Sequence, residues 1–258
     1  MWRILHLKIE MGPVWSCPDI RPLSDAEQKV AEPLYRAMAT DPALPANPVA
    51  TAGLELRVAM MLLQGSETSE QSDNEFWARK CRLLFLRPAV EPIAHSYWRR
   101  LRTLKLDEST ALRVGSAMAG RPLIYRQGSA VGRSRKGNVL FAPLESTGKW
   151  LEKIAAAAQA PELRSALPAY CFAQTIMTHP FADGNGRFAR LMAHAGLAYC
   201  SGLAGPAIAL APVFYRRGEA LGAALTALSE HGDWTRFNRV FFSVLNDAIV
   251  STRLLYSA

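Results

Sequence analysis

Residues 179–190 hold several side chains whose chemistry suits the transfer of a phosphoryl or nucleotidyl group. The imidazole of His179 titrates near neutral pH and can accept the proton of a hydroxyl group. The carboxylate of Asp183 is a hard oxygen ligand of the kind that binds Mg²⁺ together with phosphate oxygens. Arg187 and Arg190 have helical spacing, which puts two guanidiniums on one face, where they can bind phosphates. The stretch is therefore a candidate site for a substrate that carries phosphates.

Two glycines in the same stretch, Gly184 and Gly186, flank the carboxamide of Asn185. Because glycine has no Cβ, the backbone N–H groups around these positions can turn toward an anion. From Arg187 onward the sequence predicts a helix, and the positive N-terminal end of that helix faces the same place. The sequence thus predicts an anion-binding turn with a general base beside it.

Residues 179–190 are similar to the signature of Fic proteins at every position of the signature. That pattern reads His-Pro-Phe-x-Asp/Glu-Gly-Asn-Gly-Arg, with a second Arg after two further residues. The resemblance implies a protein adenylyltransferase, which moves AMP from ATP to a Ser, Thr or Tyr hydroxyl of a target protein and releases pyrophosphate. It also implies an all-α Fic fold, a helical bundle with a β-hairpin flap before the active-site loop.

The resemblance assigns a role to each matching residue. His179 would take the proton of the target hydroxyl, and Asp183 would hold Mg²⁺ between the α- and β-phosphates of ATP. Asn185 and the neighbouring N–H groups would stabilise the α-phosphate as charge builds on it, and the two arginines would hold the β- and γ-phosphates. His179 and Asn185 are thus the implied catalytic residues, and Asp183 is the implied metal ligand. The implied phosphate-binding residues are Gly184, Asn185, Gly186, Arg187 and Arg190.

The composition is that of an ordinary globular protein, with 258 residues, of which 50% are apolar and 20% charged. No apolar run is long enough to span a bilayer, and residues 1–6 include charge too early for a signal peptide. The 4 cysteines are scattered without a Cys-x-x-Cys pair, which favours thiols in a reducing cytosol over a metal site. We therefore expect no membrane partner and a cytoplasmic protein, or an effector delivered without a cleavable signal peptide.

The net charge of +8 favours acidic partners. In a chain that uses ATP, part of this excess serves the nucleotide, so we expect no nucleic acid partner. One alternative keeps the Fic fold but changes the nucleotide or phosphate donor, or the acceptor. Another alternative is a non-catalytic basic helical protein that binds nucleic acid or an acidic protein. It would account for the charge but not for the types and spacing of the residues in 179–190.

The elements that must position this stretch are predicted to be mostly helical. Residues 1–20 are expected to form an irregular arm, and residues 64–74 an exposed loop. We divide the chain into residues 1–84, an arm and helices that pack on the core, and residues 85–258, the Fic domain. On the helix that follows the motif, His194 is expected at the surface. Helices are expected at 24–38, 54–63, 74–86, 91–104, 107–118, 146–158, 168–178, 187–200, 212–230 and 233–255.

Residues 121–143 have the pattern of a β-hairpin, with strand-like runs at 121–126 and 138–143 around a Gly-, Ser- and Arg-rich stretch. In Fic proteins a hairpin flap precedes the motif and presents the target segment. The resemblance therefore implies that the target protein docks at the 121–143 hairpin. The basic residues at its tip are expected to be solvated; they are Arg126, Arg133, Arg135 and Lys136.

Two features depart from the family pattern. Many Fic proteins carry aromatic residues in the penultimate helix near the nucleotide base, but residues 219–224 contain none, which leaves a nucleotide other than ATP open. Many are also inhibited by a helix with the pattern Ser/Thr-x-x-x-Glu-Gly/Asn, whose Glu pairs with the second motif arginine. Glu55 and Glu70 are the nearest candidates, and neither is followed by Gly or Asn. We expect either no built-in inhibitory helix or inhibition by a separate small partner.

Overall fold

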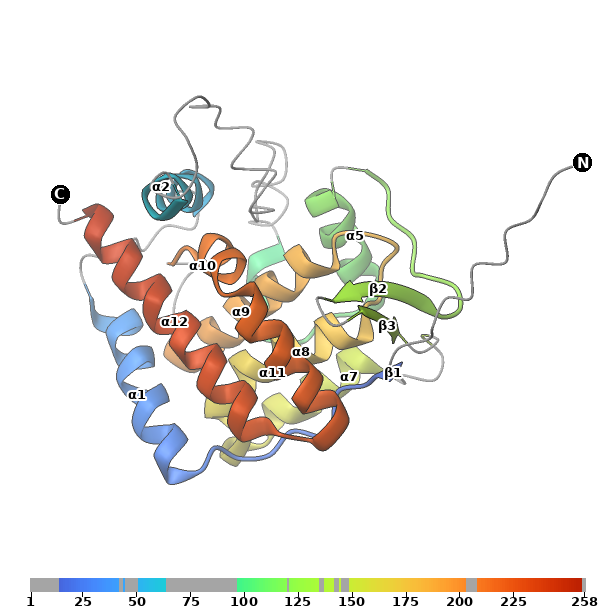
Figure 1. Cartoon of the computed structure of the whole chain (residues 1–258), viewed down its shortest axis with the longest axis horizontal. Helices are drawn as coiled ribbons and strands as arrows, with labels where there is room; N and C mark the ends of the chain where they lie inside the picture. Colours follow the sequence, from blue (N-terminus) through green and yellow to red (C-terminus); the bar gives the residue numbers. More distant parts are fainter. Residues whose placement is uncertain are drawn as a thin grey trace, which may run out of the picture.

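Two adjacent helices, α8 (Leu167–Thr178) and α9 (Asn185–Ser201), pack against each other at the centre of the molecule (Figure 1). The computed structural model of the chain describes residues 14–41, 44, 51–63, 97–119, 121–134, 137–141, 144, 149–202 and 208–256. Gly196 allows the two helices to approach closely, because a Cβ at this position would lie 2.8 Å from the Cα of Pro168. The motif occupies the connection between these helices, so the best-packed pair of the fold carries it.

The C-terminal helices α10 (Leu210–Arg216), α11 (Gly218–His231) and α12 (Trp234–Tyr256) cover one side of this pair (Figure 1). Two N-terminal helices extend that layer: α1 (Asp25–Thr40) packs on α12, and α2 (Thr51–Leu63) contacts both α10 and α12. The last helix has an apolar face that is buried in the core. Its residues are Trp234, Phe237, Phe241, Leu245 and Ile249.

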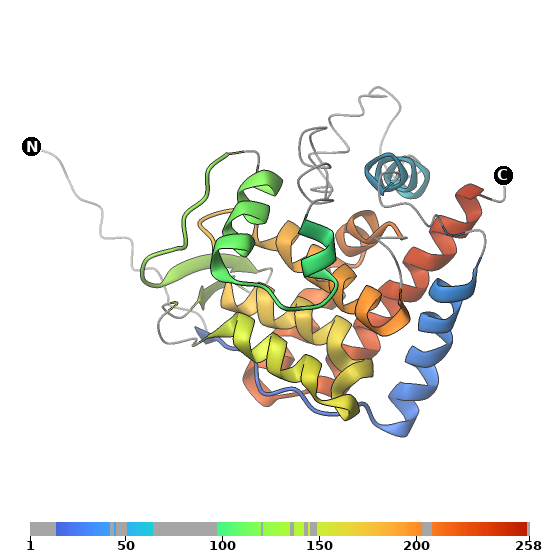
Figure 2. The same ribbon diagram turned by 180° about the vertical axis from the view of Figure 1, so that it is seen from behind.

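The other side of the central pair is covered by α5 (Glu108–Ala119), α7 (Trp150–Gln159) and the 3₁₀ helix η2 (Pro161–Ala166), as Figure 2 shows. α5 contacts α9, whereas α7 and η2 contact α8. The mostly helical fold predicted from the sequence is therefore confirmed. No helix within the described residues combines the length and the apolarity that crossing a membrane would require.

A small sheet of three strands lies beside the start of α9, in the order β1 (Val14–Trp15), β3 (Gly137–Phe141), β2 (Ala130–Ser134). β2 and β3 form an antiparallel hairpin, so the predicted hairpin is present. Its first strand is 130–134, however, and not 121–126. Residues 1–20 are not wholly irregular either, because Trp15 pairs with Phe141 in a parallel bridge and its ring meets the Phe141 ring edge-on at 5.9 Å. Such a contact across the chain leaves no local pattern in the sequence.

Several predicted helix starts are confirmed by their caps. The Ser24 hydroxyl accepts the Glu27 N–H at 3.4 Å, and Asp233 Oδ1 accepts the Arg236 N–H at 2.9 Å. The single helix predicted over 212–230 is wrong, because the structure has α10 and α11 with Arg217 between them in a non-helical conformation. The helix predicted over 74–86 and the loop predicted over 64–74 lie outside the described residues.

Candidate active site

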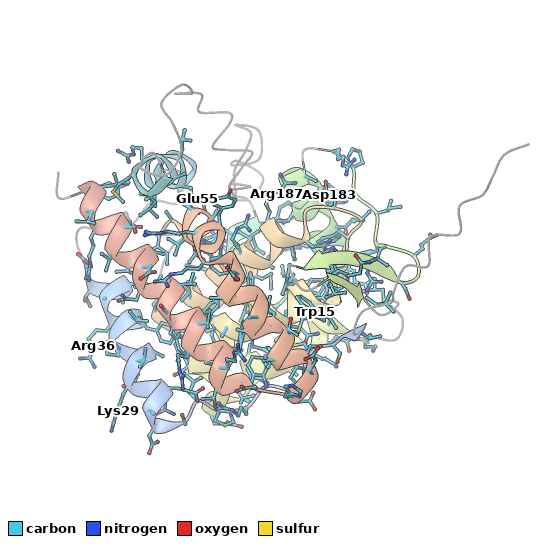
Figure 3. All side chains as sticks on the ribbon, in the orientation of Figure 1. Trp15, Lys29, Arg36, Glu55, Asp183 and Arg187 are labelled. Carbon is cyan, nitrogen blue, oxygen red and sulfur yellow. The ribbon has the colours of Figure 1, made fainter. Side chains whose placement is uncertain are left out.

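The sequence-predicted site residues come together where α8 ends and α9 begins. His179 is the C-cap of α8, Gly184 is the N-cap of α9, and Asn185 is the first residue of that helix. Figure 3 shows Asp183 and Arg187 close together at the edge of the molecule, beside α5. The site is therefore a short connection held at both ends by buried helices.

His179 leaves α8 in a left-handed conformation, with φ of 48° and ψ of 55°. For a residue with a Cβ this conformation costs roughly 1–2 kcal/mol, so the surroundings must hold it in place. The His179 N–H still donates to the Thr175 carbonyl at 3.1 Å. The imidazole lies flat on the ring of Phe141 in β3, with centroids 4.0 Å apart and planes 14° apart. The hairpin thus covers one face of the His179 imidazole.

Arg126 binds the two backbone carbonyls on either side of the His179 Cα. Its Nε donates to the His179 carbonyl at 2.7 Å, its Nη2 donates to the Thr178 carbonyl at 2.9 Å, and its Nη1 donates to the Gly128 carbonyl. The residue is 7% exposed, so the expectation of a solvated Arg126 is wrong. The physical reason is that carbonyls at a helix C-terminus lack intrahelical partners and the guanidinium supplies donors for them. The other basic positions of the tip, apart from the backbone of Arg133, lie outside the described residues.

The environment of His179 favours the neutral imidazole. Burial lowers the pKa of His179 to about 4, and the positive charge of Arg126 acts in the same direction; the Ile176 backbone and the Asp183 carboxylate oppose them. Nδ1 is buried, so Nε2 is the better placed of the two ring nitrogens to accept a proton from a substrate. At pH 7 the ring is therefore deprotonated and able to accept a proton.

The connection between the helices is braced by Phe181 and Asn185. Phe181 is fully buried, stacks on Tyr125 at 5.4 Å and meets Phe188 edge-on at 5.0 Å. The Asn185 side chain binds the backbone of Phe181. Its Oδ1 accepts the Phe181 N–H at 2.9 Å, and its Nδ2 donates to the Phe181 carbonyl at 2.7 Å. Asn185 is 2% exposed, so its carboxamide is engaged in holding the loop. Its predicted contribution at the α-phosphate stays a prediction.

Residues 124–126 pair with the motif loop, and residues 121–126 do not form the first strand of the hairpin. The N–H groups of Arg126 and Ala182 donate to the Pro180 carbonyl at 2.9 Å and to the Ile124 carbonyl at 3.4 Å, respectively. Tyr125 and Phe181, which lie between these donors and acceptors, form an antiparallel β-bridge. The segment that leads into the hairpin is thus bonded directly to the loop that carries the motif.

Asp183 carries a carboxylate that is about half exposed, at 49% of its side-chain surface. Its Oδ2 accepts a hydrogen bond from Arg121 Nη2 at 2.9 Å, and its Oδ1 accepts the Gly184 N–H at 2.6 Å. Burial alone would raise the pKa of Asp183, but the bonds from Gly184 and Arg121 and the charge of Arg187 outweigh it and hold the pKa below its usual range. The carboxylate is therefore ionised at neutral pH, as a metal ligand must be.

These properties of Asp183 fit Mg²⁺, which proteins typically hold with one or two carboxylates while waters and substrate phosphates complete the shell. Within the described ranges, no three His, Cys, Asp or Glu side chains gather into a metal-binding group. The protein ligand offered here is a single carboxylate, and one of its oxygens is bound to Arg121. A cation at this carboxylate would therefore compete with that guanidinium.

The start of α9 offers backbone donors beside two guanidiniums. Gly184 has a φ of 78°, a conformation that glycine adopts without strain, and among the described residues no side chain caps the helix. The first N–H groups of a helix have no intrahelical acceptor. A Cβ built on Gly184 would lie 3.9 Å from Arg187 Nη2, and one built on Gly186 would lie 3.7 Å from Arg190 Nη1. Both guanidiniums thus fold back toward the helix start, an arrangement suited to phosphates.

His194 lies one turn beyond Arg190 on α9 and is 1% exposed, so the expectation of a surface histidine is wrong. The reason is that α9 is enclosed by other elements and most of its residues are buried. Neither ring nitrogen has a hydrogen-bond partner within the described ranges. Burial lowers the pKa of His194 to about 3, and the charge of Arg190 acts in the same direction. His194 is therefore a neutral core residue.

Glu55, one of the two candidates for an inhibitory glutamate, is fully buried in α2. Its Oε1 accepts the N–H of Ala211, in the first turn of α10, at 3.1 Å. The carboxylate thus joins α2 to α10, and Figure 3 shows Glu55 where these two helices meet. Glu70 lies outside the described residues. The expectation that no built-in helix inhibits the protein stays a prediction.

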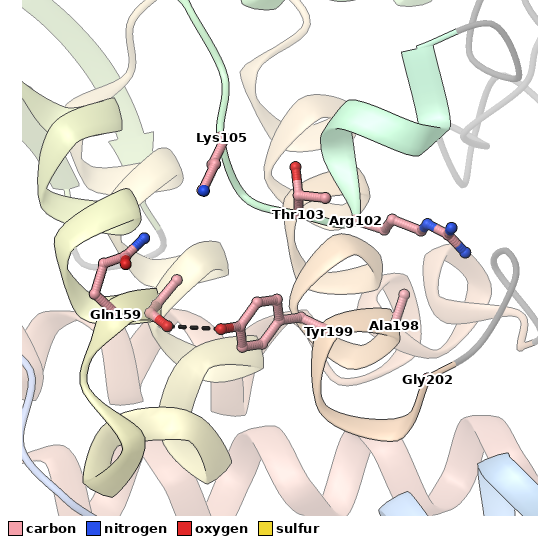
Figure 4. A pocket seen from close by; sticks show the side chains of 8 residues that line it. Arg102, Thr103, Lys105, Gln159, Ala198, Tyr199 and Gly202 are labelled. Atoms are coloured by element: carbon pink, nitrogen blue, oxygen red, sulfur yellow. Dashed lines mark hydrogen bonds between the residues drawn. The ribbon is translucent and has the colours of Figure 1, made fainter.

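A concavity of about 430 Å³ lies at the opposite end of α9 (Figure 4). The 17 residues of this helix span about 25 Å, so the concavity is well separated from the motif. On its floor the Tyr199 hydroxyl donates to the Ala158 carbonyl at 2.7 Å. Among the described residues, its lining includes Arg102 and Lys105 but neither a carboxylate nor a histidine, and no residue of 179–190. The chemistry predicted from the sequence therefore does not reside in it.

Comparisons with known proteins agree with this geometry. Residues 113–197 match the sequence model of the Fic/DOC family, so the chain contains a Fic/DOC family domain. A search of curated proteins found no match.

Solved structures extend the likeness beyond the matched residues. The chain is similar to a Fic family protein from Desulfovibrio desulfuricans G20, with 17% identity and a TM-score of 0.63 over 90% of this chain and 75% of that one. It is also similar to a Fic domain containing signaling protein from Bacteroides thetaiotaomicron VPI-5482, with 15% identity and a TM-score of 0.48 over 92% of each chain. The first likeness confirms the Fic fold, and the second adds nothing to that conclusion.

Three residues near the motif were not predicted from the sequence as part of the site: Arg121, Arg126 and Phe141. Arg121 and Arg126 lie in a segment whose pairing with the motif loop has no local signal. Phe141 ends a predicted strand, but its contact with His179 depends on how the hairpin folds over α8.

Proposed function

We propose that this protein is a Fic-type adenylyltransferase, which moves AMP from ATP to a Ser, Thr or Tyr hydroxyl of a target protein. The observation that carries the proposal is the start of α9, where uncapped backbone donors and two guanidiniums lie beside a neutral histidine and an ionised aspartate. Binding and orienting a nucleoside triphosphate requires donors of this kind, and transfer to a hydroxyl requires a base.

In the proposed reaction, the target hydroxyl oxygen attacks the α-phosphorus of ATP. A P–O bond forms to that oxygen, the bond to the bridging oxygen of the β-phosphate breaks, and pyrophosphate leaves. The hydroxyl proton passes to Nε2 of His179, because Nδ1 is buried. The N–H groups at the start of α9 would stabilise the charge that builds on the α-phosphate. Arg187 and Arg190 would hold the β- and γ-phosphates.

The low pKa of His179, about 4, refers to the protein without nucleotide. A bound triphosphate would bring negative charge close to the ring, and an opposite charge favours the protonated form. We therefore expect ATP to raise the pKa of His179 toward neutrality, where a general base is most effective. Asp183 would hold Mg²⁺, which would neutralise charge on the phosphates.

We propose that the target segment docks at the 121–143 hairpin. β2 is an edge strand of the sheet, so the groups on its outer side are available to pair with another chain. Two large apolar side chains near that edge are exposed, Ile124 at 66% and Val131 at 54%. An extended target segment could add main-chain bonds at the edge and cover these side chains.

The experiment that tests the proposal uses intact-mass spectrometry on the protein after incubation with Mg²⁺ and a panel of nucleotides. Thermal unfolding in the same mixtures reports which nucleotide binds, because a ligand of the native state raises its stability. We expect ATP to raise the unfolding temperature and to add the mass of one AMP group to the protein. Addition of a phosphoryl group, or of a different nucleotide, would support the alternative donor. No addition with any nucleotide, to this protein or to lysate proteins, would contradict transfer.

A further inference from the structure

We propose that Arg126 is a positioning residue for His179, which holds the end of α8 in the shape that presents the imidazole and couples that shape to the hairpin. The inference rests on the proposed function, because His179 matters as a base only if transfer occurs. It goes beyond that function by giving a task to a residue outside the motif.

The first support is the set of hydrogen bonds made by the guanidinium. All three nitrogens of Arg126 donate to carbonyl oxygens, two of which belong to Thr178 and His179 at the end of α8. A buried charge is costly unless it is fully hydrogen-bonded, and this arginine is 7% exposed. A cation at a helix C-terminus also interacts favourably with the helix dipole. Arg126 therefore has both the geometry and the charge of a cap for α8.

The second support is the conformation that the cap encloses. His179 has a φ of 48°, and a residue with a Cβ persists there only where its surroundings impose it. Arg126 Nε fixes the His179 carbonyl at 2.7 Å, and the ring of Phe141 fixes the imidazole at 4.0 Å between centroids. One contact sets the backbone of the histidine, and the other sets its side chain.

The third support is the connection to the hairpin. The Arg126 N–H donates to the Pro180 carbonyl at 2.9 Å, and its Nη1 donates to the Gly128 carbonyl, two residues before β2. Arg126 thus bonds to three consecutive residues, 178–180, and to Gly128, which lies just before the first strand of the hairpin. A target segment docked on the hairpin would act on the position of His179 through Arg126.

The test compares Arg126→Lys with a matched control, Arg164→Lys. Lysine keeps the charge of Arg126 but loses the planar fork that reaches two carbonyls at once. Arg164 also donates to a carbonyl near a helix end, that of Tyr199 at 3.2 Å, but it lies at the far end of α9. We expect Arg126→Lys to lower kcat by at least 10-fold with the Kd of ATP changed less than 2-fold, and Arg164→Lys to change neither by more than 2-fold.

A second readout follows His179 without any need for transfer. The Cε1–H resonance of His179, assigned by its loss in His179→Ala, is titrated by NMR in wild type, Arg126→Lys and Arg126→Gln. The charged groups that act on this ring in the wild type are Arg126 and Asp183. We expect Arg126→Gln to raise the pKa of His179, because a positive charge is removed, and Arg126→Lys to shift the resonance with little change in pKa.

The outcomes separate this inference from the proposed function. An unchanged kcat in Arg126→Lys, or an unchanged His179 resonance in both variants, would overturn the positioning role. If the wild type transfers nothing, the proposed function fails, and the titration still decides whether Arg126 positions the ring. If Arg126→Gln does not fold, Arg126→Lys decides alone through its kcat and its resonance.

Discussion

The two ends of α9 differ in what their polar groups do. At the N-terminal end, Asp183 and Arg187 stay partly exposed, and His179 is held in a left-handed conformation with a pKa of about 4. Strain, perturbed titration and partly exposed charge coincide there, as they do at many functional sites.

At the C-terminal end the polar groups bind one another. The Tyr199 hydroxyl donates to Ala158, and Arg164 donates to the Tyr199 carbonyl while its guanidinium lies 5.6 Å from the centre of the Tyr199 ring. The concavity of about 430 Å³ lies at this end, yet its lining has no acid–base pair. The comparison teaches that side-chain chemistry, rather than hollowness, identifies the site in this fold.

The largest expected effect separates the two ends by activity. His179→Ala should lower the rate of AMP transfer by about 10²–10⁴-fold, because the general base is lost. ATP binding should persist, since the imidazole acts on the acceptor hydroxyl. Tyr199→Phe at the far end should leave the rate unchanged. The measurement is the initial rate of transfer beside the Kd of ATP, and a wild-type rate in His179→Ala would remove this residue from the mechanism.

A second effect concerns stability at acid pH and the two histidines of this helix pair whose pKa is lowered by burial. His179 and His194 have folded-state pKa values of about 4 and about 3, against 6.5 as the ordinary value. Between pH 6.5 and about 4, these two histidines bind protons in the unfolded chain but not in the native state. The free energy of unfolding therefore falls as the pH falls from 6.5 toward 4. The slope is at most roughly 1.4 kcal/mol per pH unit for each histidine.

Urea unfolding between pH 4 and 7 measures this slope. His194→Leu removes a group that becomes charged on unfolding. The free energy of unfolding should therefore depend less on pH in this variant, in which the motif residues are unchanged. His231→Ala is the control, because this exposed histidine lies at the end of α11. An identical dependence of the free energy of unfolding on pH in wild type and His194→Leu would show that burial of His194 does not cause the loss of stability at low pH.

A third prediction compares hydrogen bonds at the two ends. Asn185→Ala leaves both the N–H and the carbonyl of Phe181 without their side-chain partner in a buried setting, at a cost of roughly 1–3 kcal/mol for each group. Tyr199→Phe removes one bond at the edge of the concavity and should cost about 0.5–1.5 kcal/mol. Chemical denaturation of both variants checks the order, and an equal loss would mean that the loop is not braced by Asn185.

A fourth prediction concerns affinity for the outer phosphates. Arg190→Ala should weaken ATP by about 10- to 100-fold, because a charge-assisted hydrogen bond is worth roughly 1.5–3 kcal/mol. AMP, which lacks the β- and γ-phosphates, should bind almost as before. Arg164→Ala at the other end of α9 should change neither affinity. Titration calorimetry with both nucleotides decides, and equal weakening of ATP and AMP would place Arg190 away from the outer phosphates.

The smallest expected effect concerns Arg121, whose pair with Asp183 is exposed at 63% and 49% of the two side chains. Arg121→Gln should change the free energy of unfolding by less than about 1 kcal/mol at pH 7, as exposed ion pairs do. The lowered pKa of Asp183 means that this contribution is present at neutral pH and is lost as the pH falls below about 4. The same variant should bind Mn²⁺ more tightly by EPR, because the competing guanidinium is gone; weaker binding would contradict competition.

The sequence predicts those parts of the fold that depend on local pattern. The capping box at Ser24, the N-cap at Asp233 and the apolar face of α12 each depend on residues close together in the sequence. The division of 212–230 into two helices was missed, although Gly218, the first residue of α11, directly follows the turn at Arg217.

The site was predicted as a list of residues, and its surroundings were not. His179 and Asp183 were found by type and spacing, whereas the stack on Phe141 and the cap by Arg126 arise from packing between distant segments. His194 was misplaced because its helix is enclosed by its neighbours, so polarity alone gave the wrong face. Local pattern therefore points to the candidate reacting groups, and tertiary packing sets their protonation and position.

The most direct test of the central claim uses ATP labelled at the α-phosphate or at the γ-phosphate, with Mg²⁺, on the wild type and on His179→Ala. We expect α-label to become attached to protein in the wild type, no γ-label to be attached, and both signals to be absent in His179→Ala. Attached γ-label would mean that a phosphoryl group is transferred instead of AMP. Equal α-labelling of wild type and His179→Ala would contradict the claim that the start of α9, with His179 as its base, is the active site.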